Sequence, residues 1–490
     1  MFSWLTGSRD EPAPPDVDVL VCHSLDVSTE GITMTYGLFI PARLDAEKLK
    51  LAAFTTVEKK LSRAGARLAY RNGKYEYHVP KSFTKDTPAL SFTSDQYDSP
   101  FQSEKYNFPP KVGNDLASSP FVSPFPEDAV KALFKTATTP QTTADFLVPN
   151  TPMVHIHVSV FEDVTLIGFT APHMLFDGAG ASTFLSTWTA ALNGTLEELP
   201  EAPRTFAPFD DLVESVGGRE VCAARRGPSG QPVRGWDAFY TIGILRFMFA
   251  LFKRAFFEGS EDTRLIYVPL EWLAARKDEC MQELKARGSD EWVGSNDVLM
   301  AYICKMMCVN RTDATLVSMI VPVNIRPILT DFFTHTYLHN ALMSPKVPSL
   351  SANVLGSQPI VDTALVLRRG LNEILADKTT LKHELAWVCA SFPGARPVMI
   401  PNPPNVELAS ISNWRSMAMN KLDFSGALPD GVSVLARPEF LFSYRTENPM
   451  LPLRGAGAVC SESDHGLWLY VTLGRGVWDR MWRSGMIAFA

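Results

Sequence analysis

The chain has 490 residues, of which 46% are hydrophobic and 20% are charged, and its formal net charge is −7. This length predicts two domains of roughly 200 residues each, and the composition is typical of a globular protein. The acidic balance, without a long basic run, argues against nucleic acid as a partner. The seven dispersed cysteines argue against a disulfide framework and for a reducing compartment.

No stretch reaches the uninterrupted apolar length of a membrane span. The first fifteen residues lack the basic start and the long apolar region of a secretory signal. We therefore expect a cytoplasmic protein.

The first part of the chain alternates predicted strands with helices. Apolar residues recur at helical spacing over 45–65, which predicts an amphipathic helix. The segment 84–125 is rich in Pro, Ser and Thr and is predicted to be mostly loop. Apolar or alternating runs predict strands at 17–27, at 31–42, at 74–80 and twice within 152–170.

The stretch TAPHMLFDGAG (170–180) follows the second of these paired strands and precedes a predicted helix that ends at Gly194. A histidine at such a junction can accept a proton near neutral pH, and the glycine after Asp177 allows a sharp turn. Two interpretations of His173 remain open from these residues alone. It is either a general base or a hydrogen-bonded core histidine.

Beyond the helix, the segment 206–260 is rich in Pro, Gly and Arg and predicts a long crossover between two halves. The alternation of strands and helices then resumes at 261. Ser295 is predicted to cap a helix. Later strands and a closing helix complete a second α/β half.

Other candidate sites are weaker. His155 and His157 share one face of a strand and have the chemistry of metal ligands, but no third ligand lies nearby in the sequence. Two polar residues on a strand face are the more common case, so we predict no metal site. The chain lacks a nucleophile elbow, a Walker-type loop and a complete dinucleotide fingerprint.

The order of motifs resembles that of the BAHD acyltransferases, in particular the divergent fungal members that modify natural products. His173, Asp177 and Gly178 match the family motif H-x-x-x-D-G. Further segments resemble family motifs in the same order and span nearly the whole chain: HSLD (23–26), RAGARLAYRNGKYEYHVP (63–80), SNDVLMAYI (295–303), VPVNIRP (321–327), YLHNAL (337–342) and SISNWRSMAMNKLDFSGA (410–427).

Two departures from the family pattern stand out. His339 replaces the glycine that usually precedes Asn340, and the late motif at 423–427 lacks its second glycine and its tryptophan. Because the resemblance assigns the late motif a mainly structural role, we still expect an active enzyme. The resemblance implies two similar chloramphenicol-acetyltransferase-like α/β domains with mixed sheets flanked by helices. It places them at 1–205 and 261–490, joined by a linker at 206–260, with the active-site channel at their interface.

The resemblance also implies a mechanism and roles for residues. His173 takes the proton of an acceptor hydroxyl while the oxygen attacks an acyl-CoA, with acetyl-CoA as the default donor. Trp414, with Ser412 and Asn413, is assigned to the oxyanion and the acyl-CoA, as is Ser295. Asp177 points away from the histidine and pairs with an arginine, for which Arg326 is the candidate. Asn340 and Asp423 are assigned structural roles.

The implied acceptor is an alcohol of a lipophilic secondary metabolite such as a terpenoid or polyketide, and the implied state is a monomer. Two rival interpretations remain open. One is a carrier-protein-dependent condensation enzyme, although that class usually has two consecutive histidines where Pro172 and His173 stand here. The other is a non-acylating cyclase or binding protein that uses the same channel.

The segment 238–257 is apolar nearly all round a helix. Such a helix is normally buried or lies at a membrane surface. Arg246, Lys253 and Arg254 have the length to reach lipid headgroups. The sequence leaves both alternatives open: packing against the domains, or peripheral membrane contact that brings lipophilic acceptors to the channel.

Overall fold

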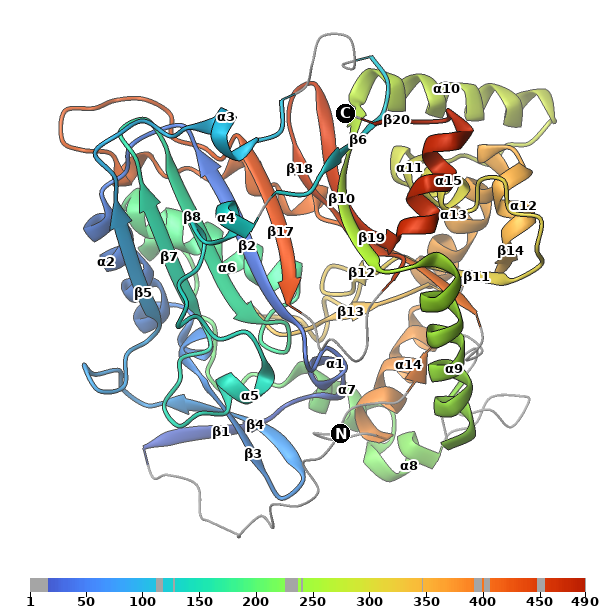
Figure 1. Cartoon of the computed structure of the whole chain (residues 1–490). Helices are drawn as coiled ribbons and strands as arrows, with labels where there is room; N and C mark the ends of the chain where they lie inside the picture. The colour runs from blue at the N-terminus through green and yellow to red at the C-terminus, as the bar shows by residue number, and fades with distance from the viewer. Residues whose placement is uncertain are drawn as a thin grey trace.

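In the computed structural model, the described residues are 16–111, 118–126, 128–224, 237–238, 241–345, 347–391, 399–400, 406–446 and 454–489. The predictions for the first fifteen residues and for 225–236 lie outside them. Two large mixed sheets lie side by side, each flanked by helices (Figure 1), as the sequence predicts.

The first sheet has five strands in the order β17-β2-β8-β7-β5. Every residue of β2 and β8 is buried, which fits their central places in the sheet. They pair antiparallel, with Thr33 opposite Pro172, so the end of β8 is fixed where the histidine motif begins. The strands are β2 (Thr33–Ile40), β5 (Ser91–Gln96), β7 (His155–Val160), β8 (Thr165–Pro172) and β17 (Phe440–Thr446).

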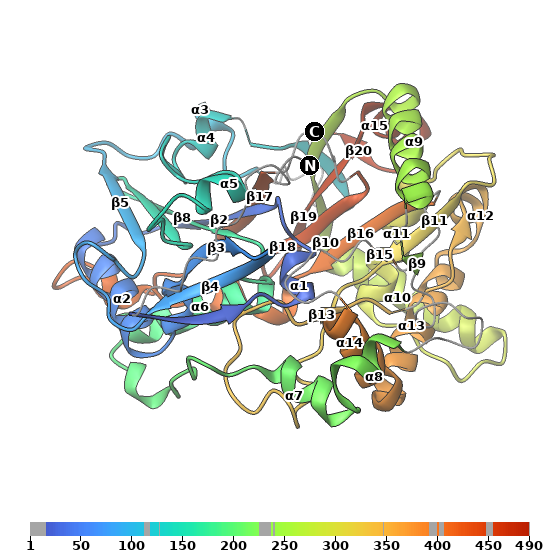
Figure 2. The same cartoon turned by 90° about the horizontal axis from the view of Figure 1, so that it is seen from below.

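Two amphipathic helices, α2 (Ala46–Lys59) and α6 (Gly178–Leu192), pack together against this sheet (Figure 2). Asp45 caps α2 by accepting from the backbone N–H groups of Glu47 and Lys48 at 2.8 and 3.1 Å. The predicted helix 45–65 is thus confirmed over Ala46–Lys59, and a separate 3₁₀ turn follows over Ser62–Gly65.

The second sheet has eight strands in the order β14-β11-β16-β18-β19-β10-β6-β20. It is mixed, because β16 runs parallel to both β11 and β18 while β10 and β19 pair antiparallel. The strands are β6 (Phe121–Pro124), β10 (Glu261–Pro269), β11 (Leu316–Ile320), β14 (Leu350–Ser351), β16 (Glu407–Asn413), β18 (Ala456–Glu462), β19 (Gly466–Gly474) and β20 (Ala488–Phe489).

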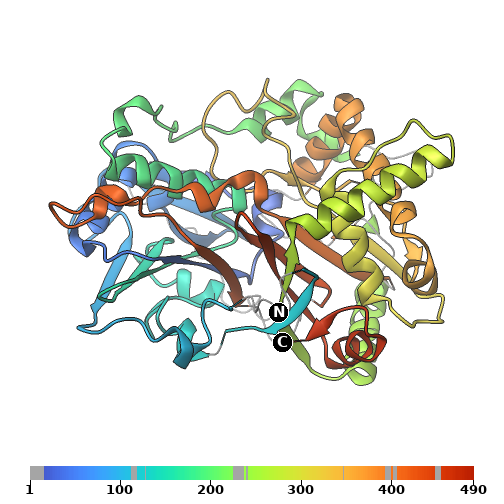
Figure 3. The same ribbon diagram turned by 90° about the horizontal axis from the view of Figure 1, so that it is seen from above.

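The helices on the right of Figure 3 share a second apolar core with this sheet. These helices are α10 (Leu270–Ala286), α11 (Ser295–Met307), α13 (Ile360–Ala376) and α15 (Arg475–Ser484). One expectation for α11 is wrong: its N-cap is Gly294, whose N–H donates to Asp297 Oδ2 at 2.7 Å, and Ser295 is the first helical residue.

Each large sheet takes a strand from the opposite end of the chain. β6 lies early in the sequence but joins the second sheet beside β10, whereas β17 lies late and joins the first sheet beside β2. The two halves are therefore interlocked. The predicted domain limits at 205 and 260 stay a prediction.

A third apolar cluster lies below the two sheets and is formed by α7 (Pro208–Ser215), α8 (Gly218–Ala224), α14 (Lys378–Ser391) and the segment 325–343.

The three-stranded sheet β1-β4-β3 lies alongside the first sheet (Figure 1). Its strands are β1 (Val17–Val21), β3 (Arg67–Arg71) and β4 (Lys74–Pro80). Two two-stranded ladders pair β12 (Val323–Asn324) with β13 (Leu342–Met343) and β9 (Asp237–Ala238) with β15 (Met399–Ile400).

One sequence prediction needs correction. The run 17–27 is not one strand, because β1 ends at Val21 and a helical turn, α1 (Ser24–Val27), follows. The segment 84–125 is mostly irregular in its described part, as predicted, and it also supplies the short strands β5 and β6. The remaining short helices are α3 (Ser103–Tyr106), α4 (Asp128–Lys131), α5 (Thr143–Phe146) and α12 (Ala352–Ser357).

The crossover contains a long helix, α9 (Thr241–Glu258), which covers most of the predicted apolar segment 238–257. Among the described residues, no helix combines the length and the apolar character needed to cross a bilayer.

Candidate active site

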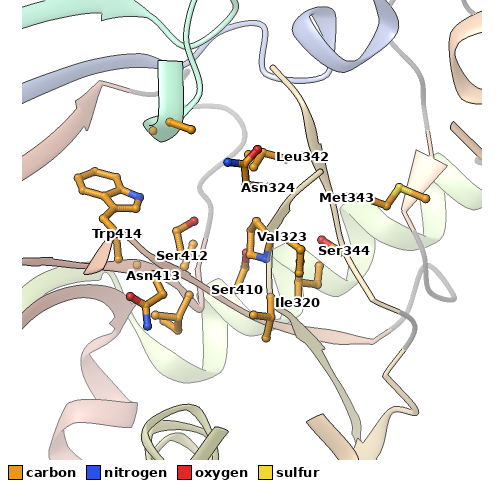
Figure 4. A pocket seen from close by; sticks show the side chains of 18 of the residues that line it. Ile320, Val323, Asn324, Leu342, Met343, Ser344, Ser410, Ser412, Asn413 and Trp414 are labelled. Carbon is orange, nitrogen blue, oxygen red and sulfur yellow. The ribbon is translucent and has the colours of Figure 1, made fainter. Parts of the chain in front are cut away.

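A cavity of about 1000 Å³ lies between the two large sheets. This volume is at the upper end for a small-molecule site. Its walls come from β2, from the start of α6, and from β16 and the β12–β13 ladder, which face each other across the space in Figure 4. Trp414 and Asn413 stand at one side, with Leu342 and Met343 at the other.

His173 lines this cavity directly after β8. Its backbone N–H donates to the carbonyl O of Ile32 at 2.9 Å, which continues the β2–β8 ladder by one residue. Its Nδ1 is buried.

The pKa of His173 is lowered from the usual 6.5, chiefly because burial disfavours the charged ring. The positive charge of Arg445 lowers this pKa further, whereas hydrogen bonds to the backbone and the negative charge of Asp177 act in the opposite direction. A neutral imidazole at physiological pH is the form that can accept a proton.

Asp177 does not contact the histidine and instead forms the centre of a buried cluster. Its carboxylate accepts from Arg326 Nη1 at 2.9 Å and from Nη2 at 3.1 Å, and its side chain is fully buried. The predicted contact between these two residues across the halves is thereby confirmed. The same carboxylate accepts from the N–H groups of Gly180 at 2.8 Å and Ala341 at 2.9 Å.

The carboxylate therefore caps α6 and holds the segment 326–341 at the same time. The fit is close, because a Cβ at Gly180 would lie 1.9 Å from the carbonyl O of Leu338. Gly180 is thus the glycine that this contact requires. Gly178 has no positive φ, so the predicted need for a glycine at a sharp turn is not the reason for its presence. A Cβ at Gly178 would approach Met417 Cε at 2.6 Å and Trp414 Nε1 at 3.3 Å.

Three successive carbonyl groups of the histidine loop accept hydrogen bonds from neighbouring side chains. Asn340 Nδ2 donates to the carbonyl O of His173 at 2.9 Å and to that of Met174 at 3.1 Å. Tyr77 Oη donates to Met174 O at 2.6 Å. His339 Nδ1 donates to Leu175 O at 3.0 Å.

His339 replaces the usual glycine with a ring that packs. It stacks on Tyr77 with ring centroids 4.5 Å apart and planes 6° from parallel. Because a carbonyl only accepts, Nδ1 carries the proton of this ring. Burial lowers the pKa of His339 well below its usual value, so the ring stays neutral.

Asn340 is in turn held by Asp26, which accepts from its N–H at 2.9 Å and from its Nδ2 at 3.1 Å. Burial raises the pKa of Asp26 to about 7, and hydrogen bonds from Asn340, His23 and Tyr77 limit the rise. HSLD, which contains this aspartate, therefore lies directly behind the histidine loop.

The residues predicted to handle the oxyanion and acyl-CoA lie along one wall of the cavity. Ser412 and Asn413 are on β16, and Trp414 follows it with its ring 5.3 Å from that of Tyr36. Ser295 is not among the cavity-lining residues, whereas its neighbours Asn296 and Asp297 are. Their roles in catalysis remain predictions.

Asp423 lies away from the cavity. Its Oδ1 accepts from the N–H of Ser425 at 2.9 Å, and its carbonyl accepts from Asn193 Nδ2 at 2.7 Å. It thereby joins the late motif to the end of α6. Within this motif Gly426 cannot carry a side chain without a clash, because a Cβ there would lie 2.1 Å from the carbonyl O of Leu192.

Sequence reasoning missed several polar residues of the cavity, among them Tyr36 on β2, Arg445 on β17 and Tyr470 on β19. Burial raises the pKa of Tyr470 to about 12, so its hydroxyl is a neutral donor. These residues belong to no motif, and strand alternation is the only signal that they carry.

The competing metal site does not assemble. His157 Nδ1 lies 2.8 Å from Thr93 Oγ1, and His155 Nε2 lies 2.9 Å from the carbonyl of Pro152. Within the part of the chain that the structure describes, no group of three or more ligating side chains has the geometry to hold a metal ion. The seven cysteines, all among the described residues, are buried and form no disulfide bond.

Comparisons with known proteins agree with this geometry. Residues 252–450 match the model of the Transferase family. The chain is similar to acetyltransferase adrJ of Penicillium roqueforti, with 26% identity over 456 residues that cover 89% of this chain and 88% of the relative. It is also similar to O-acyltransferase pboC of Aspergillus ustus, with 25% identity over 451 residues that cover 85% and 87%.

Among solved structures, the fold is similar to that of TRI101 of F. sporotrichioides, which was solved in complex with coenzyme A and T-2. The TM-score is 0.62 at 13% identity, and the match covers 96% of this chain and 97% of TRI101. This likeness confirms the predicted two-domain α/β fold.

We expect Asp177→Ala to lower the free energy of unfolding by about 3–5 kcal/mol, because it leaves Arg326 as a buried cation without its counter-charge. Urea denaturation measures this change. Asp430→Ala is the control, since the Asp430–Lys48 pair is exposed and its loss should leave unfolding nearly unchanged. Equal, small changes in both variants would contradict the central place of Asp177.

We expect His339→Ala to lower kcat by about tenfold to a hundredfold while the KM for the acyl donor stays unchanged, because the histidine loop loses a donor and a stacked ring behind it. Steady-state kinetics on the purified variant separates the two constants. His335→Ala, on a ring that contacts Phe206 instead, should leave both constants unchanged. A rise in KM alone would mean that His339 does not position the loop.

Proposed function

Because the chain belongs to the Transferase family of BAHD-type acyltransferases and is itself an acyltransferase, we propose that it acetylates a hydroxyl group of a lipophilic secondary metabolite with acetyl-CoA as donor. The observation that carries the proposal is the position of His173, a neutral base that lines a cavity between the two halves. The names of the similar proteins, acetyltransferase and O-acyltransferase, support the reaction class.

In this mechanism, the acceptor hydroxyl approaches Nε2 of His173. The nitrogen takes the proton as the oxygen forms a bond to the thioester carbon, and such a base typically supplies about 10²–10⁴-fold in rate. The tetrahedral intermediate then collapses, the C–S bond breaks, and the thiolate receives the proton from the imidazolium. The products are an ester and free coenzyme A, and no covalent acyl-enzyme is formed.

The oxyanion of the intermediate needs a hydrogen-bond donor. Trp414 Nε1 is our candidate, because it reaches the start of α6 close to His173. Ser412 and Asn413 continue the same wall and are our candidates for the acyl-CoA. Asp177, Arg326 and Asn340 act through the backbone and through packing, so we assign them positioning roles, and Asp423 a structural role.

The walls of the cavity support a lipophilic acceptor. Val323, Leu342 and Met343 lie opposite the polar wall of β16, and Ile320 lies beside Ser410 on the neighbouring strand β11 (Figure 4). A terpenoid or polyketide alcohol would place its rings on this apolar side and its hydroxyl toward His173. An apolar wall with a few convergent polar groups is the usual form of such a site.

Two rival functions predict different products. A carrier-protein-dependent condensation enzyme would use a tethered donor, and a non-acylating binding protein would release no thiol. Incubation of the purified protein with acetyl-CoA and a panel of hydroxylated terpenoids and polyketides, with detection of free thiol and of the ester, separates all three. Absence of thiol release with the whole panel, together with transfer from an acylated carrier protein, would contradict our proposal.

We expect His173→Ala to fold normally and to lose acetyl transfer by at least about a hundredfold. The measurement is thiol release with the accepted alcohol, with circular dichroism as the check on folding. His465→Ala, which changes an exposed histidine in the turn between β18 and β19, should retain full activity. Near-normal turnover of His173→Ala would show that another group acts as the base.

The lowered pKa of His173 predicts the pH profile. Protonated imidazole cannot accept a proton, so kcat/KM should fall on the acid side and reach a plateau above the pKa of the free enzyme. Because burial lowers that pKa, we expect the midpoint of the acid limb below 6.5. A midpoint well above 6.5 in a kcat/KM profile would contradict this environment.

A further inference from the structure

Helix α9 exposes a continuous apolar face. Four large side chains recur at helical spacing (i, i+4, i+7, i+11), and Phe257 stands beside them. The exposed fractions are 65% for Leu245, 71% for Phe249, 67% for Phe252, 83% for Phe256 and 73% for Phe257. A soluble monomer rarely exposes so many large apolar residues together, and such a face usually marks a contact surface.

Of the two alternatives that the sequence left open, packing against the domains does not hold for these five side chains. The opposite face of α9 does pack. Arg254 points inward to Glu407 at 3.3 Å, and Glu258 lies 3.6 Å from Arg454 and 3.8 Å from Arg480. The side chains of Ile242, Ile244, Phe247 and Leu251 lie outside the described set.

The charges on the outer side of α9 are of one sign. Its four charged residues are Arg246, Lys253, Arg254 and Glu258, of which the last two form the inward ion pairs described above. Arg246 and Lys253 are exposed and lie on one flank of the apolar stripe. We propose that this face, Leu245, Phe249, Phe252, Phe256 and Phe257 with Arg246 and Lys253, docks the enzyme on an anionic membrane surface.

The chemistry of the face fits a bilayer better than a second copy of the chain. Phenylalanine and leucine side chains insert at the boundary between headgroups and acyl chains, and flanking cations bind anionic lipid. Two copies of α9 face to face would instead bring Arg246 and Lys253 of both chains together without an acidic partner on the outer faces. The helix thus lies on the membrane rather than across it.

The docking face is connected to the active site. Arg454 lines the cavity, and its guanidinium donates to the carbonyl O of Gly259 at 2.6 Å and of Arg254 at 3.4 Å. The end of α9 is thus held by a residue of the cavity wall. This position would let a lipophilic acceptor pass from the bilayer to the site. That last step rests on the proposed function.

Vesicle flotation tests the docking face directly. The purified full chain is mixed at low salt with vesicles of phosphatidylcholine, with or without phosphatidylserine, and the floated fraction is measured. We expect the wild type to float with the anionic vesicles and Phe249→Glu/Phe252→Glu to partition at least about tenfold less. Arg246→Glu/Lys253→Glu should lose the preference for phosphatidylserine.

Leu51→Glu is the matched control, because Leu51 is 71% exposed on α2, which lies at the other end of the molecule (Figures 1 and 2). This variant should float like the wild type. A wild type that stays unbound with anionic vesicles would overturn the proposal. A second result would also overturn it. If sedimentation shows a wild-type dimer that Phe249→Glu/Phe252→Glu dissociates, and neither protein binds vesicles, the face is a contact with a second copy of the chain.

Thiol release without vesicles separates this proposal from the proposed function. With a water-soluble alcohol, the α9 variants should have the same turnover as the wild type. With an acceptor dissolved in anionic vesicles, the KM for that acceptor should be raised only in the α9 variants. Flotation without any acyl transfer would support the docking face and contradict the reaction. Equal KM values in vesicles would contradict delivery of the acceptor through this face.

Discussion

The carboxylate of Asp177 is the point on which the site depends. It accepts four hydrogen bonds, two from Arg326 of the second half and two from the backbone N–H groups of Gly180 and Ala341. A charge this deeply buried is tolerated only where donors surround it. The halves therefore close in one register, with the start of α6 and the segment after Arg326 fixed together. The position of His173 at the interface follows from this single arrangement.

Around that point, the backbone of the histidine loop is held more tightly than its ring. Asn340, Tyr77 and His339 all donate to its carbonyl groups, so the loop is fixed from behind while the ring faces the cavity. The buried side of this network contains Asp26, whose raised pKa reflects its depth. A rigid backbone with a free imidazole edge suits a base that must meet substrates of different shape.

The sequence was sufficient to predict the contact between Asp177 and Arg326, because the resemblance to a family with motifs in a fixed order implied both residues. The role of His173 as the base stays a prediction. It also predicted the mixed α/β fold and several strands, since β2, β8 and β19 are rich in apolar, β-branched and aromatic residues. It did not predict Tyr36, Arg445 and Tyr470, which reach the cavity only through strand pairing across the chain. Nor did it predict that β6 belongs to the second sheet and β17 to the first, because local sequence patterns carry no information about distant strand partners. The apolar pattern of α9 left burial and exposure open, and the packing of Arg254 and Glu258 shows which face is covered.

The central claim is that the acyl group passes directly from coenzyme A to an alcohol at His173. Intact-protein mass spectrometry after a rapid quench, with isotopically labelled acetyl-CoA, tests it most directly. The account predicts that label appears in the ester as thiol is released, while the mass of the protein never changes. A labelled acyl-protein that forms without the acceptor and is discharged when the acceptor is added would contradict it, because the acyl group would then pass through a covalent intermediate.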